Sequence, residues 1–160
     1  MYVHTAEQMV HCTWYMVNDK MTIKQLSIFI ENKGGTLIKV LDLLSKAGIQ
    51  IIASTVADTK DYGIYRVLTN NPAQAYLILK DAGINVQLSE VFALSIDDQP
   101  GRAAETIKEI SDAGVSILYL YSFLWKGKGV LVFRADQSEK AKESIMLNKL
   151  TFLTEEDFRA

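Results

Sequence analysis

Hydrophobic residues occupy alternate positions between residues 24 and 32, where Leu26, Ile28 and Ile30 are separated mainly by polar side chains. A period of two is typical of a strand with one face in a hydrophobic core. The same pattern returns later in the chain and predicts a second such strand. Its apolar positions are Phe92, Leu94 and Ile96.

After each of these strands, the hydrophobic spacing changes to that of an amphipathic helix. Gly48 and Gly114 follow the first helix of each part, where a glycine favours the end of a helix. The four predicted helices cover residues 37–47, 72–82, 103–113 and 138–148.

Most of the segments between the helices are rich in β-branched and aromatic residues, which favour strands. Tight turns near Gly63 and Gly129 predict one hairpin in each part of the chain. A last strand follows the second helix of each part. The further strands are predicted at residues 49–56, 64–69 and 84–90, and at residues 115–125, 130–135 and 151–157.

These elements repeat, because a shift of 66 residues superimposes the sequence on itself without a gap. Ala47-Gly48 falls on Ala113-Gly114, and Gly63 falls on Gly129. Each copy has the order βαββαβ, and right-handed crossovers then place both helices on one face of a four-stranded antiparallel sheet. The predicted fold class is therefore α+β, with two ferredoxin-like units and one open sheet face in each.

The repeat also predicts the domain organisation. We expect a poorly ordered extension at residues 1–21, a first domain at residues 22–90 and a second domain at residues 91–160. A unit of this size buries only about 60% of its unfolded surface, so units of this kind are expected to complete each other's burial. We therefore expect a homodimer or a higher oligomer.

Composition narrows the class of partner. The chain has 160 residues, 49% hydrophobic and 22% charged, and a net charge of -2. This balance gives no electrostatic reason to expect nucleic acid or an anionic membrane as a partner. A single cysteine excludes an intramolecular disulfide, and no signal-peptide pattern opens the chain, so we expect a cytoplasmic protein.

The residues that most often perform catalysis are scarce. The histidines and the cysteine are His4, His11 and Cys12, all within the first twenty residues, and they are either an incomplete metal site or tail side chains. We favour the tail interpretation and expect neither a metal nor a cofactor. The rest of the chain lacks the commonest nucleophiles and bases, so we expect no enzymatic activity.

The most specific local pattern joins the first strand to the first helix of each copy. Residues 32–37 read NKGGTL and residues 98–103 read DQPGRA. A helix N-terminus exposes unpaired N–H groups, so a small carboxylate placed there gains hydrogen bonds and roughly 0.3 to 1 kcal/mol from the helix dipole. Gly35 and Gly101 either let the backbone approach such a ligand or only make the turn.

These loops resemble the ACT domain, the amino-acid-sensing module of many metabolic enzymes. The resemblance covers residues 22 to about 158. It implies that an amino acid binds between units, bounded by the loop of one unit and the second strand of its neighbour. The matching residues are Asn32, Gly35, Leu37, Ala47-Gly48 and Ile49 in the first copy, and Asp98, Pro100, Gly101, Ala113-Gly114 and Val115 in the second.

The ligand-binding residues that the resemblance implies come from both copies. They are Asn32, Gly34, Gly35, Thr36, Leu37, Ile52, Ala53 and Ser54, and Asp98, Pro100, Gly101, Arg102, Ala103, Leu118 and Tyr119.

The two loops differ at positions that a ligand would touch. Gly34 stands where the second copy has Pro100, and Thr36 stands where it has Arg102. Arg102 either clamps a carboxylate or pairs with Asp97 or Asp98, and the Asn or Asp that opens each loop either binds an ammonium group or caps its helix. We expect two non-equivalent sites, or one working site and one vestigial site.

Three functional hypotheses follow. The leading one is a non-catalytic regulatory protein that binds an amino acid. The alternative is a regulatory subunit that acts in trans on a metabolic enzyme, has no ligand of its own, and makes contact through the aromatic row from Tyr119 to Trp125. A small enzyme is disfavoured, because no nucleophile and base pair is visible.

Overall fold

The computed structural model describes residues 17–31, 33–58 and 62–159 of the chain. Its order of elements confirms the α+β class and the two βαββαβ units, with the last strand of the second unit reduced to a single bridge. The strands are β1 (Ile23–Glu31), β2 (Ile51–Asp58), β3 (Tyr62–Thr69), β4 (Val86–Ile96), β5 (Ile117–Trp125) and β6 (Lys128–Ala135). The helices are α2 (Thr36–Lys46), α3 (Pro72–Asp81), α4 (Arg102–Asp112) and α5 (Ser138–Leu147), and a 3-10 helix, η1, spans Glu155–Phe158.

The chain forms two compact units that are not consecutive segments. The first-repeat unit contains Lys24–Val91 together with residues 155–159, and the second-repeat unit contains residues 17–23 together with Phe92–Thr154. Residues 1–16 of the expected extension lie outside the described residues. Met21, which the sequence placed at the end of that extension, is 1% exposed and packs in the core of the second-repeat unit.

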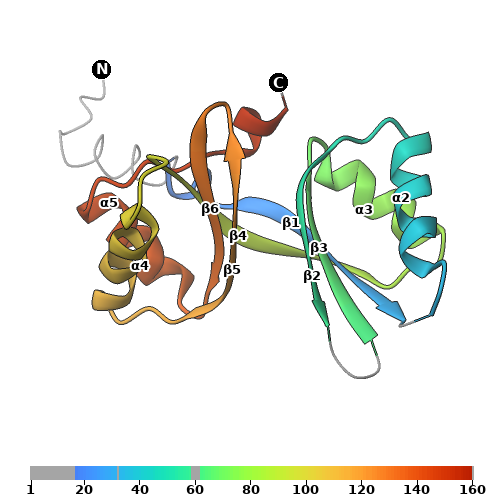
Figure 1. Ribbon diagram of the computed structural model, residues 1–160, viewed down its shortest axis with the longest axis horizontal. Helices are drawn as coiled ribbons and strands as arrows, with labels where there is room; N and C mark the ends of the chain where they lie inside the picture. Colours follow the sequence, from blue (N-terminus) through green and yellow to red (C-terminus); the bar gives the residue numbers. More distant parts are fainter. Residues whose placement is uncertain (1–16, 32, 59–61, 160) are drawn as a thin grey trace, which may run out of the picture. The chain divides into compact units, whose positions relative to one another are not determined.

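In the first-repeat unit, the sheet order is β2-β3-β1-β4, and β1 pairs antiparallel with β3, with Ile28 opposite Tyr65. Both α2 and α3 lie on one face of this sheet (Figure 1). The polar face of β1, expected to be open, is buried instead: the Gln25 amide donates a hydrogen bond to Ser27 Oγ at 3.3 Å. The core between sheet and helices contains Leu26, Ile28, Val40, Leu44, Val67, Ala75 and Leu79.

In the second-repeat unit, β6 lies between β4 and β5 and pairs antiparallel with both. Phe92 of β4 stacks on Phe133 of β6, with ring centroids 5.2 Å apart. The predicted last strand, at residues 151–157, is reduced to a single bridge between Leu94 and Phe152. Beyond that bridge the chain joins the first-repeat unit, where the Glu155 carboxylate accepts a hydrogen bond from the Lys24 N–H at 3.1 Å.

Strand β4 runs continuously from Val86 to Ile96, although the sequence predicted two strands there. No glycine or proline interrupts this stretch, so nothing in the backbone forces a break. Its residues up to Val91 belong to the first-repeat unit, and those from Phe92 onward belong to the second.

Candidate functional site

The two strand-helix loops have the same backbone conformation. Gly35 and Gly101 precede α2 and α4 with φ angles of 92° and 89°, in the left-handed region that favours glycine. Their carbonyls accept hydrogen bonds from Lys39 N at 3.1 Å and from Glu105 N at 3.0 Å. The turn alone thus requires both glycines. No described atom lies within 4 Å of a Cβ built at either position, so the space in front of each is open.

The side chains of the first loop hold the loop itself. The Thr36 hydroxyl is within hydrogen-bonding distance of the Glu31 carbonyl at 2.8 Å and the Lys33 carbonyl at 3.0 Å. The Glu31 carboxylate pairs with Lys33, which lowers the pKa of Glu31 and raises that of Lys33. Asn32 lies outside the described residues. In this copy, therefore, Thr36 serves the turn.

In the second loop, Arg102 pairs with neither residue that the sequence suggested. Its Nη1 lies 2.6 Å from Glu105 Oε2, one turn along α4. Asp97 is paired with Lys128 at 2.7 Å, and the hydrogen bond from that lysine lowers the pKa of Asp97. The side chain of Asp98 makes no hydrogen bond or ion pair with the described residues, and the residue that caps α4 is Gly101. Asp98 is therefore available to an ammonium group.

A pocket of about 400 Å³ opens beside the second loop. The predicted residues Asp98, Gly101 and Ala103 line it, whereas Pro100, Arg102, Leu118 and Tyr119 do not. Its other wall includes residues that the sequence reasoning missed. They are Ser122, Phe123 and Leu124 of β5, and Gly129 and Val130 of β6.

Strand register explains the missed wall. Gly129 pairs with Ile96, the last residue of β4, and also with Leu124 of β5. The loop after β4 therefore lies beside the end of β5 that is nearest the hairpin, away from Leu118. A pairing scheme drawn outward from the predicted turn at Gly129 would have found Ser122 to Leu124.

The remaining predicted residues lie in the first-repeat unit. Leu37 packs against the hydrophobic core of that unit. Ile52, Ala53 and Ser54 belong to β2, which has a register shift between Ile51 and Ala53. Their contribution to a ligand site, and the place of a ligand between neighbouring units, stay predictions.

The described part of the chain contains no cluster of three or more metal-ligating His, Cys, Asp or Glu side chains. His4, His11 and Cys12 lie outside it. Among the described helices, none has the length and apolar character needed to cross a bilayer.

Comparison with solved structures identifies relatives along nearly the whole chain. A protein of Bacteroides thetaiotaomicron is 35% identical with a TM-score of 0.83, over 88% of this chain and 98% of that one. The regulatory subunits of aspartate kinase from Thermus thermophilus and Thermus flavus are 14% and 16% identical, with TM-scores of 0.56 and 0.52. Each aligns over 81% of this chain and 93% of its own. For these two regulatory subunits, identities of 14% and 16% show a shared fold alone.

A search of curated protein sequences found no match. The family described as "ACT domain pair" matches residues 21–160, which span both repeats and both strand-helix loops. This match confirms the resemblance drawn from the loops, and the chain belongs to the ACT domain pair family.

Proposed function

We propose that the protein is a non-catalytic regulatory protein that binds a free amino acid at the strand-helix loop of its second repeat. The observation that carries the proposal is the pocket of about 400 Å³ lined by Asp98, Gly101 and Ala103. Its volume lies at the small end of the range of ligand sites, which suits a ligand of amino-acid size.

The loop offers both groups that an amino acid requires. Gly101 is the N-cap of α4 and has no side chain to cap the helix, so the N–H groups of the first turn of α4 are suited to a carboxylate. Asp98 is exposed and has no partner among the described residues, so its carboxylate is suited to an ammonium group. The first loop lacks an equivalent described carboxylate, and its Thr36 is already used in the turn. We therefore assign the working site to the second repeat.

A thermal-shift screen against the twenty amino acids tests the proposal. A ligand at a hundredfold over its dissociation constant stabilises by about 2.7 kcal/mol, which is a shift of several degrees for a chain of this size. A flat profile for all twenty contradicts the proposal.

Two variants locate the site. Asp98→Asn removes the charge that an ammonium group would contact, and we expect the dissociation constant to rise about tenfold. Ser122→Trp fills the pocket from an exposed strand position, and we expect it to abolish binding. Glu143→Gln, an exposed carboxylate on α5 outside this pocket, is the matched control and is expected to bind like the wild type.

The alternative, a subunit that acts in trans on a metabolic enzyme, draws support from β5. The sequence suggested a contact through the aromatic row from Tyr119 to Trp125, but those side chains are half-buried, and the exposed row lies on the opposite face of the strand. Leu118, Leu120 and Leu124 of this strand are 58%, 45% and 66% exposed. A row of exposed leucines on a strand that pairs on one side is suited to a protein contact. This alternative predicts partner binding with no response in the amino-acid screen, which separates it from the leading proposal.

A further inference from the structure

A second cavity lies within the second-repeat unit, under one side of α4. Its volume is about 360 Å³, and its walls come from the end of β4, successive turns of α4, the start of β6 and the segment after α5. It shares Ile96 and Asp97 with the loop pocket, and its other lining residues are different.

Comparison of the repeats shows that two polar residues of this cavity wall replace apolar residues of the first repeat. Thr106 stands where the first repeat has Val40, which is 2% exposed in the core. Glu109 stands where it has Leu43, which packs against that core. The two equivalent helix positions therefore carry apolar side chains in the first-repeat unit and polar side chains in the second.

The backbone conformation at Lys149 is a second difference between the repeats. Lys149 has a φ of 52°, and the equivalent residue of the first repeat is Gly83, with a φ of 75°. Glycine is the usual residue in this left-handed region, and other residues persist there where the surroundings support them. The second repeat thus has a lysine on the cavity wall at a position where the backbone favours glycine.

Two ion pairs form among the charged side chains that line the cavity, and one carboxylate and one ammonium group have no partner among the described residues. Lys128 pairs with Asp97, and Arg102 pairs with Glu105. The other two charged side chains of the wall, Glu109 and Lys149, make no hydrogen bond or ion pair with any described residue. A simple anion would meet the free carboxylate and a simple cation the free ammonium, whereas a zwitterion neutralises both.

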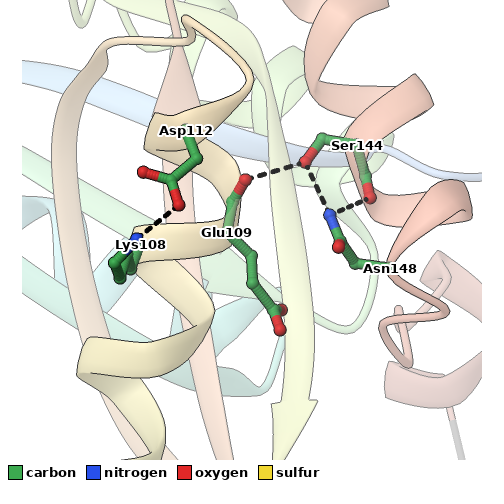
Figure 2. A network of polar contacts seen from close by, with 5 residues as sticks. All are labelled: Lys108, Glu109, Asp112, Ser144 and Asn148. Atoms are coloured by element: carbon green, nitrogen blue, oxygen red, sulfur yellow. Dashed lines mark hydrogen bonds and ion pairs between the residues drawn. The ribbon is translucent and has the colours of Figure 1, made fainter.

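A hydrogen-bond network links the backbone at Glu109 to Ser144 and Asn148, at the end of α5 (Figure 2). Ser144 Oγ donates to the Glu109 carbonyl at 3.2 Å, and Asn148 Nδ2 donates to Ser144 Oγ at 3.2 Å and to the Ser144 carbonyl at 3.0 Å. Asn148 immediately precedes Lys149. In Figure 2 the side chain of Glu109 extends away from this network, and no contact is drawn to its carboxylate.

We propose that this cavity is a second binding site, which takes a free α-amino acid as its zwitterion, with the ammonium group at Glu109 and the carboxylate at Lys149. The site goes beyond the loop site of the proposed function and does not depend on it, because the two carboxylates, Glu109 and Asp98, line different cavities.

The first repeat supplies the substitutions that test the site. Glu109→Leu and Lys149→Gly each introduce the residue that the fold already accepts at the equivalent position, and Glu109→Gln removes the charge alone. Nitrogen-15 NMR spectra titrated with each of the twenty L-amino acids show where each one binds. We expect at least one amino acid to shift the amide signals of Thr106, Glu109 and Lys149.

For that amino acid, each of the three variants is expected to raise the dissociation constant at least tenfold. Its analogues that lack the amino group or the carboxyl group are expected to bind at least tenfold more weakly. Glu143→Gln is the control and leaves binding unchanged.

Asp98→Asn separates the two sites, because we expect it to weaken shifts around Ser122 and to leave those at Glu109 intact. The cavity proposal is overturned if no amino acid shifts the signals of its wall, or if Glu109→Leu and Lys149→Gly bind like the wild type. Failure of the loop site alone leaves the cavity shifts in place.

Discussion

The backbone N–H of Ser116 donates a hydrogen bond to Asp136 Oδ1 at 2.9 Å. The first repeat forms the same bond, from Gln50 N to Asn70 Oδ1 at 3.1 Å. The geometry is duplicated, but the acceptor is charged in one copy only. In that copy, the bond from Ser116 is the largest cause of a lowered pKa for Asp136.

A group with a depressed pKa in the folded state stabilises the fold above its unfolded-state pKa, and this contribution is lost as the pH falls through the folded-state pKa. Asp136→Asn keeps the acceptor and removes the titration. Urea unfolding from neutral pH to below about pH 4 should therefore show less loss of stability on acidification for this variant than for the wild type. The reverse substitution, Asn70→Asp, should steepen the loss. Equal pH profiles for all three proteins would contradict the assignment.

Gly34 and Gly35 are adjacent but have different backbone requirements. Gly35 has a φ of 92°, whereas Gly34 lies outside the left-handed region, and a Cβ at either position meets no described atom within 4 Å. Gly35→Ala is expected to lower the free energy of unfolding by roughly 1 to 2 kcal/mol, from backbone strain alone. Gly34→Ala is the control, and we expect it to be neutral or up to about 1 kcal/mol more stable. Denaturant melts measure both, and equal effects would show that the turn does not need a left-handed residue.

Ser144 is 2% exposed and links α5 to α4 through the Glu109 carbonyl. Ser144→Ala removes that bond and one of the two bonds of the Asn148 amide, so we expect a loss of about 1 to 3 kcal/mol of stability. Ser111→Ala, at an exposed position on α4, should change stability by less than about 0.5 kcal/mol. Urea unfolding compares the pair, and similar values would mean that the network contributes little.

The exposed leucines of β5 predict self-association. Replacing Leu118 and Leu124 with lysine puts two charges on the strand, which is how natural edge strands discourage pairing. In sedimentation equilibrium we expect an oligomer for the wild type and association weakened at least tenfold, about 1.4 kcal/mol, in the double variant. Unchanged circular dichroism serves as the folding control. An unchanged mass distribution would place the contact elsewhere, and a monomeric wild type would contradict a homo-oligomer.

Periodicity was sufficient to predict most of the elements, because each hydrophobic pattern occurs twice and each copy supports the interpretation of the other. It could not predict where strands join or shrink. Nothing in the sequence around Val91 distinguishes one long strand from two short ones, and the single bridge at Phe152 depends on how the chain continues toward η1.

The candidate site was predicted on one side only. A local turn places Asp98 and Gly101, so the sequence pattern located them. Ser122 depends on register across β6, and Arg102 depends on Glu105, an acidic residue one turn away that competes for its guanidinium. A charged side chain with several possible partners pairs with the one that the fold brings nearest, and the sequence alone does not give these distances.

Each unit includes a short segment that is distant in sequence from the rest of it, residues 17–23 in one unit and residues 155–159 in the other. This exchange sets the order in which the two units can be completed as the chain is translated. The core that contains Met21 cannot close until Phe92 and the residues after it have been synthesised, and the first-repeat unit stays incomplete until Phe158 has emerged. Neither repeat can therefore complete its unit from its own consecutive residues. The second-repeat unit is complete at Thr154, and the first-repeat unit only with the residues that follow it, so the unit whose main segment is translated first is the last to be completed.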